Sequence, residues 1–88
     1  MQYMVIERFK DVRKIYQRLR DRGRLMPNGL RYVDSWISED LSRCFQLMET
    51  DRPELFEEWI SNWSDLMDFE VVGTITSDKA GESALRLE

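Results

Sequence analysis

Two hydrophobic periodicities alternate along this chain, and their order is what most constrains the fold it can adopt. Apolar side chains at every second residue are typical of a strand with one buried face, whereas spacings of three and four residues are typical of a helix. The segments with these patterns, in chain order, are a strand at residues 2–8, a helix from residue 12 to Gly23, strands at residues 30–37 and 43–50, a helix from residue 51 to about residue 67, and a strand at residues 68–76.

The resulting order, β-α-β-β-α-β, predicts a ferredoxin-like α+β fold, in which two helices cover one face of a four-stranded antiparallel sheet. Pro27-Asn28-Gly29 predicts a turn, because proline presets φ and Asn-Gly accepts positive φ. Asp51 with Glu54 three residues on, and Pro53 between them, predicts the capped start of the second helix. An arc of ~140° on that helix holds its apolar residues Leu55, Phe56, Trp59, Ile60, Trp63, Leu66 and Met67.

The chain has 88 residues, which is enough for one small domain that we place at residues 1–76. Residues 77–88 are polar and small and predict a flexible C-terminal tail, in which Leu87-Glu88 could derive from cloning. No run approaches the ~18 apolar residues of a membrane span, and residues 1–7 lack the basic start of a secretory signal. We therefore expect a cytoplasmic protein with no membrane partner.

Charge is distributed unevenly, although the net charge is only −4. Residues 1–44 carry ten Lys/Arg against six Asp/Glu, and residues 45–88 carry three against eleven. The arginines of the first helix could bind phosphates or nucleic acid. We favour a solvated face, or one that complements Glu54, Glu57 and Glu58 of the second helix, and expect no nucleic-acid partner.

The absence of histidine and the presence of a single cysteine exclude many familiar sites. A disulfide framework is impossible, and the commonest general base and metal ligand is missing. Cys44 is expected to be a small packed hydrophobe rather than a nucleophile. We expect no metal and no cofactor.

A hairpin register in which paired residue numbers sum to 80 gives the middle of the sheet two unlike faces. One face, with Val33 opposite Leu47 and Ser35 opposite Phe45, suits the helices. The other face carries Tyr32 opposite Met48, Asp34 opposite Gln46, and Trp36 opposite Cys44. Such a mixture of large apolar and polar groups is a poor surface for water, so it predicts either a dimer interface or the wall of a ligand pocket.

Several short segments also resemble one known family. They are Arg22-Gly23-Arg24 with Pro27, Gly29-Leu30-Arg31-Tyr32, Asp34-Ser35-Trp36, Cys44-Phe45-Gln46-Leu47-Met48-Glu49, and Trp59 through Trp63-Ser64-Asp65-Leu66 to Asp68-Phe69-Glu70. The chain up to Val72 resembles the bacterial domain of unknown function 3303, although Gly73 stands where a proline is expected. The resemblance implies a dimeric α/β-barrel fold of the kind that small cofactor-free monooxygenases share, and it implies no activity.

From these observations we expect a homodimer that binds a small organic ligand on the open sheet face. The expected pocket is lined by Tyr32, Asp34, Trp36, Gln46 and Met48, with Glu7 and Glu70 at its margins. Any catalysis would use Asp34 as the base, in a cofactor-free oxygenation of an electron-rich substrate. The alternatives are that Asp34 and Gln46 form a structural pair, and that the protein is a non-catalytic interaction module whose sheet face serves only dimerisation.

Overall fold

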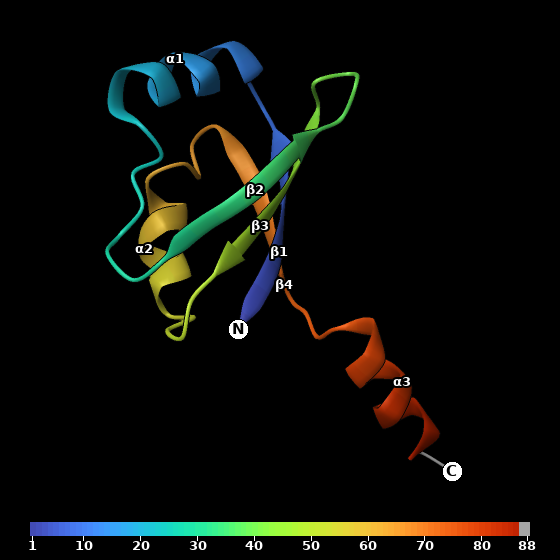
Figure 1. The fold of residues 1–88 in the computed structure, drawn as a ribbon. Coiled ribbons are helices and arrows are strands. Elements are labelled where there is room, and N and C mark those ends of the chain that lie inside the picture. The colour runs from blue at the N-terminus through green and yellow to red at the C-terminus, as the bar shows by residue number, and fades with distance from the viewer. Residues whose placement is uncertain (87–88) are drawn as a thin grey trace.

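The computed structural model of the chain describes residues 1–86. Its elements are β1 (Gln2–Phe9), α1 (Val12–Arg22), β2 (Arg31–Ile37), β3 (Arg43–Glu49), α2 (Leu55–Ser61), β4 (Met67–Gly73) and α3 (Ser77–Leu85). The four strands form one antiparallel sheet in the order β2-β3-β1-β4 (Figure 1). The predicted ferredoxin-like α+β fold is therefore confirmed.

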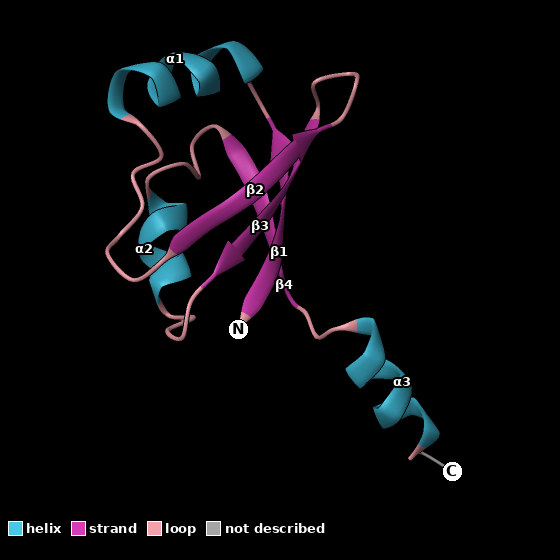
Figure 2. Cartoon of the chain, viewed as in Figure 1, coloured by secondary structure: helices cyan, strands magenta, loops and turns pink. Residues whose placement is uncertain are grey.

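The helices α1 and α2 lie on the same side of this sheet, and α3 extends away from it (Figure 2). The core fills the space between the sheet and the first two helices. Its buried residues are Val5, Ile15, Leu30, Met48, Leu55, Phe56, Trp59, Trp63, Leu66 and Met67. The strand predicted at residues 2–8 is found as β1, whose odd-numbered residues face the helices and whose even-numbered residues do not.

Helix α1 has the boundaries that its sequence predicts. The side chain of Asp11 caps its start by accepting a hydrogen bond from the Lys14 N–H at 3.0 Å. At its end Gly23 adopts a φ of +68°, and its N–H donates to the Leu19 carbonyl at 2.9 Å. A glycine is favoured there because a positive φ strains other residues.

Helix α2 is shorter than the sequence predicts. It begins at Leu55 without a side-chain cap, so Asp51 does not start it, and it ends at Ser61 instead of about residue 67. Tight turns carry the chain from Asn62 to Leu66, and they still bury Trp63 and Leu66. The apolar stripe thus predicts burial correctly, but it does not distinguish a continuous helix from a helix followed by turns.

The C-terminal segment forms helix α3, where the sequence predicts a flexible tail. The side chain of Thr76 caps it by accepting from the Lys79 N–H at 3.2 Å. None of the helix residues is buried. Flexibility of this segment therefore stays a prediction, and Leu87-Glu88 lie outside the described residues.

The predicted register of the central hairpin is wrong beyond its first two pairs. Arg31 and Tyr32 pair with Glu49 and Met48 as predicted, but Asp34 then pairs with Leu47, because a β-bulge at Val33 inserts one extra residue. A shift of one residue turns every following side chain to the opposite face. Residues 34–37 of β2 therefore lie on the faces predicted for them, whereas Tyr32 and the whole of β3 lie on the faces opposite to the prediction. Cys44, Gln46 and Met48 face the helices, and Phe45 and Leu47 lie on the open face.

Candidate functional site

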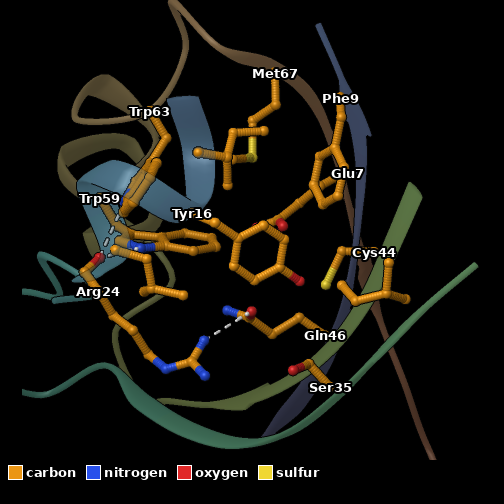
Figure 3. A pocket seen from close by; sticks show the side chains of 13 residues that line it. Glu7, Phe9, Tyr16, Arg24, Ser35, Cys44, Gln46, Trp59, Trp63 and Met67 are labelled. Atoms are coloured by element: carbon orange, nitrogen blue, oxygen red, sulfur yellow. Dashed lines mark hydrogen bonds between the residues drawn. The ribbon is translucent and has the colours of Figure 1, made fainter. Parts of the chain in front are cut away.

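A cavity of about 110 Å³ lies between the sheet and the two covering helices (Figure 3). Glu7, Ser35, Cys44 and Gln46 line its sheet side, and Tyr16 and Arg24 approach from α1 and from the loop that follows α1. The apolar remainder of its wall consists of Phe9, Ile15, Leu19, Ile37, Trp59, Trp63 and Met67. It is thus a small chamber, open on one side, whose wall is divided about evenly between apolar and polar side chains.

Glu7 is the most unusual group in this wall, because the side chain belongs to the buried row of β1 and the residue is only 5% exposed. Burial raises the pKa of Glu7 to about 7, although the Cys44 thiol that hydrogen-bonds to it and the positive charge of Arg24 both lower it. The carboxyl group therefore exists in both protonation states near neutral pH. A group with that property can accept and return a proton under ordinary conditions.

Cys44 lies directly opposite Glu7 in the ladder between β1 and β3. Burial raises the pKa of the Cys44 thiol to about 12, and the charge of Glu7 and the hydrogen bond to Glu7 raise it further. The thiol therefore keeps its proton and donates a hydrogen bond to the Glu7 carboxylate. As the sequence predicts, Cys44 is buried, and the high pKa argues against a role as a nucleophile.

Tyr16 lies at the mouth of the cavity, where the residue is 45% exposed. The side chains of Tyr16, Glu7 and Cys44 converge in Figure 3, with the tyrosine hydroxyl directed inward. Partial burial raises the pKa of Tyr16, and the acidic groups of Cys44 and Glu7 add to this rise. The phenol is therefore neutral at physiological pH and available as a hydrogen-bond donor.

Arg24 brings a positive charge to the opposite side of the cavity. One of its nitrogens, Nη1, donates to Oε1 of Gln46 at 3.3 Å, and its Cζ lies 3.6 Å from the centroid of the Tyr32 ring. Within residues 1–86 no carboxylate forms a salt bridge with this guanidinium. Arg24 is thus held by an amide and an aromatic face, and its charge is not neutralised by a neighbouring acid.

The main chain at Arg24 is fixed independently of the Arg24 side chain. Its carbonyl oxygen accepts hydrogen bonds from the indole N–H groups of Trp59 and Trp63, at 3.1 and 2.9 Å. The next residue, Leu25, has a φ of +57°, and its carbonyl accepts from the Asn62 side chain at 3.1 Å. Three donors from α2 and the turn after it therefore hold this strained loop against the cavity.

Gln46 and Ser35 complete the polar part of the wall. The Gln46 amide donates from Nε2 to the Met48 sulfur at 3.3 Å while its oxygen accepts from Arg24. The Ser35 hydroxyl and the Tyr32 hydroxyl are 2.8 Å apart and share a hydrogen bond. These contacts fix the orientation of the amide and of the Tyr32 ring on which Arg24 lies.

The structure does not bring the seven candidate site residues together. Glu7, Tyr32, Gln46 and Met48 are on the side of the sheet that the helices cover. Asp34, Trp36 and Glu70 belong to the opposite face, and all three are exposed. The predicted Asp34–Gln46 pair is therefore wrong, because the bulge at Val33 pairs Asp34 with Leu47. The Asp34 carboxylate instead accepts from the Ser35 N–H at 2.8 Å.

Tyr16, Arg24, Ser35 and Cys44 line the cavity and are absent from the predicted pocket. One signal in the sequence points to this side of the sheet: Glu7 alternates with Tyr3, Val5 and Phe9, which places a carboxyl group in an apolar row. Arg24 has no such signal, since it lies in a loop whose path depends on Trp59 and Trp63, more than thirty residues away.

Two further features of the described chain bear on the classes of function. Across residues 1–86, no helix has the length and the apolar character that crossing a membrane requires. The same residues contain no cluster of three or more acidic or sulfur ligands that could hold a metal ion.

Comparison with curated proteins and with solved structures gave no match. The family model described as Domain of unknown function (DUF3303) matches residues 1–88, which is the whole chain. The resemblance that the sequence motifs suggest is thereby confirmed, and the chain belongs to the family of domains of unknown function DUF3303.

Proposed function

We propose that this protein binds a small organic molecule in the cavity between its sheet and its helices, and that Glu7 exchanges a proton with that molecule. One observation carries the proposal. Glu7 is a buried carboxyl group in a cavity wall, and within residues 1–86 it has no salt-bridge partner.

A buried carboxyl group without an ion pair lowers the stability of a fold, because ionisation there loses hydration that the Cys44 thiol and the charge of Arg24 replace only in part. An apolar residue at position 7 would continue the row of Tyr3, Val5 and Phe9 at no such cost. Perturbed acids in a cavity of this kind are typical of sites that transfer protons. This cost is what favours a functional role for Glu7 over a structural one.

The other cavity residues suit the remaining tasks of such a site. Trp59 and Phe9 offer apolar surface to the body of a ligand, while Tyr16 offers a hydroxyl at the mouth. The enzymatic form of the proposal is cofactor-free oxygenation. That reaction begins when a base removes a proton from an electron-rich substrate, and Glu7 takes the role that the sequence assigns to Asp34.

The three tryptophans allow a direct test of ligand binding. The indoles of Trp59 and Trp63 line the cavity, whereas Trp36 is on the open face and is 52% exposed. Titration with phenol, followed by the indole N–H signals in a ¹⁵N-correlated NMR spectrum, should move the Trp59 and Trp63 signals and leave the Trp36 signal in place. Movement of Trp36 alone, or of no indole, would contradict the proposal.

Catalysis is tested separately by oxygen uptake. With an electron-rich diphenol as substrate, the wild-type protein should consume oxygen faster than Glu7→Gln, which keeps the shape of the side chain but cannot accept a proton. Equal rates for the two proteins, both at the rate of uncatalysed autoxidation, would reject the enzymatic form and leave binding without turnover.

We also propose that the open face of the sheet associates with a second copy of the chain. Six of its residues are apolar: Met4, Ile6, Trp36, Phe45, Leu47 and Val72. Along β3 this face reads Arg43, Phe45, Leu47 and Glu49, so a basic and an acidic residue flank an apolar centre, and Glu49 also forms a salt bridge with Arg31 of β2. A two-fold axis perpendicular to β3 would place Arg43 of each copy against Glu49 of the other, which makes the row complementary to itself.

Sedimentation equilibrium tests this association. Leu47→Glu should shift the wild-type dimer toward the monomer, whereas Ile75→Glu, an exposed site away from the sheet, should not. Arg43→Glu should weaken the dimer, and the double variant with Glu49→Arg should restore it. A wild-type protein that sediments as a 10.6 kDa monomer at micromolar concentration would reject the proposal.

If the dimer forms but phenol moves no indole signal, the alternative function is favoured. The protein would then be an interaction module whose sheet face serves dimerisation.

A further inference from the structure

The charge of Arg24 points to the kind of ligand that this cavity accepts. The guanidinium carries five N–H donors, and the structure shows one of them, on Nη1, bound to the Gln46 oxygen at 3.3 Å. Its flat face rests on the Tyr32 ring, which leaves the edge as the part that can bind a further group. A planar fork of donors of this kind matches the two oxygens of a carboxylate.

Glu7 does not take this place. No salt bridge joins the two side chains, although the positive charge of Arg24 acts on Glu7 through space. When Glu7 is protonated, the cavity holds one net positive charge. That charge favours an anion, because Arg24 is partly buried and water screens the attraction less there than at the surface.

We propose that the ligand is a small monocarboxylate with an apolar body, whose carboxylate is bound by Arg24 while Glu7 is protonated. This inference rests on the proposed function and names its ligand class. A cavity of about 110 Å³ admits only a compact body, since a closed apolar cavity of ~150 Å³ binds a single benzene ring. A phosphate is disfavoured, since its two charges would meet one arginine and the Glu7 carboxyl.

Proton uptake should accompany binding. The groups that face Glu7 are the Cys44 thiol from β3, the Tyr16 hydroxyl from α1 and the guanidinium of Arg24. The cavity residues from α2, the turn after it and β4 are uncharged, namely Trp59, Trp63 and Met67. A bound carboxylate adds a negative charge that disfavours ionised Glu7, so the complex binds a proton and weakens as the pH rises through about 7.

The test compares benzoate with benzamide, which has the same ring and a similar shape without the charge. Affinities are measured at pH 6 and pH 8 from the shifts of the Trp59 and Trp63 indole signals. At pH 6 we expect benzoate to bind the wild-type protein about tenfold more tightly than benzamide. At pH 8 that preference should fall, whereas Glu7→Gln should show the preference at both pH values.

Two arginine variants give a matched pair. Arg24→Gln should abolish the preference for benzoate, whereas Arg22→Gln should keep it, because Arg22 is an exposed residue of α1 and does not line the cavity. The hydrogen bonds that hold the loop use the Arg24 carbonyl, so Arg24→Gln should fold. If the Trp59 and Trp63 indole signals of ligand-free Arg24→Gln have the same positions as in the wild-type protein, the variant is folded. Arg24→Lys, which keeps the charge but lacks the fork, should retain part of the preference.

Failure of this inference can be told apart from failure of the proposed function. If phenol and benzamide move the Trp59 and Trp63 signals but benzoate binds no better, or if Arg24→Gln keeps the preference, the monocarboxylate assignment is wrong and the cavity still binds ligands. If none of the three probes moves these signals, both proposals are wrong.

Discussion

At residue 7 the pleat of β1 directs a carboxyl group into the core, and the pH dependence of stability should reveal its cost. The pKa of Glu7 rises from 4.5 in an unstructured chain to about 7 in the fold, so the folded state binds the proton more tightly. The stabilisation by that proton is complete below pH 4.5 and is lost as the pH rises through about 7. The variant Glu7→Gln does not lose this stabilisation, because an amide side chain stays uncharged throughout this pH range.

We therefore expect the free energy of unfolding of Glu7→Gln to exceed that of the wild type by about 3 kcal/mol at pH 8, and the gap to close toward pH 4.5. Urea unfolding at several pH values, followed by tryptophan fluorescence, measures the difference. A constant gap between the two proteins across this range would show that Glu7 titrates normally.

Cys44 gives a second prediction at the residue scale. Because burial and Glu7 raise the pKa of its thiol to about 12, almost no thiolate exists at pH 8. We expect the folded protein to react with iodoacetamide at least a hundredfold more slowly than the urea-unfolded chain, whose thiol titrates normally. Mass spectrometry over time measures both rates. Similar rates would mean that the thiol is reactive in the folded state.

Among the elements, α1 is joined to the turn after α2 by one arginine. Arg18 donates to both Asp65 oxygens, at 2.8 and 2.7 Å, and to the Asn62 carbonyl at 2.8 Å. An ion pair between the arginines of α1 and Glu54 is not found within residues 1–86, because Glu54 forms its salt bridge with Arg52. The basic helix α1 is thus linked to the region of α2 through Asp65, which lies in the turn after α2.

Arg18→Ala should lower the free energy of unfolding by about 1 kcal/mol, since the pair is bidentate but partly exposed. Arg13→Ala on the same helix is the control and should change it by less than ~0.5 kcal/mol, because Arg13 has no salt bridge within residues 1–86. Thermal unfolding of both variants beside the wild type measures the changes. Equal losses would mean that helix propensity, not the Asp65 contact, stabilises α1.

For the whole molecule, the clearest contrast is between the core and α3. This nine-residue helix buries no side chain, and helices of that length without packing are marginal in water. We expect its backbone amides to exchange with deuterium within seconds, while those of the central strands β1 and β3 are protected for far longer. Exchange monitored by NMR tests this, and protected α3 amides would indicate that α3 packs against another copy of the chain.

The sequence by itself determines much of this fold. The order of the periodicities predicts the six main elements, because amphipathic spacing depends on which side chains must be buried and not on the partner that buries them. The same reasoning finds the first strand, and Gly23 marks the end of α1 through its positive φ. Glu7 is accordingly within reach of the sequence, as a candidate for the margin of a site.

The faces of the hairpin and the composition of the site were decided only in the tertiary structure. Strand β3 turns Gln46 to the helix side, while the extra residue at Val33 leaves Asp34 on the open side, and an alternating pattern cannot locate such a bulge when both faces carry apolar side chains. Arg24 reaches the cavity because Trp59 and Trp63 bind its carbonyl across the fold. Local pattern therefore determines the elements, whereas contacts between residues distant in sequence determine which side chains meet.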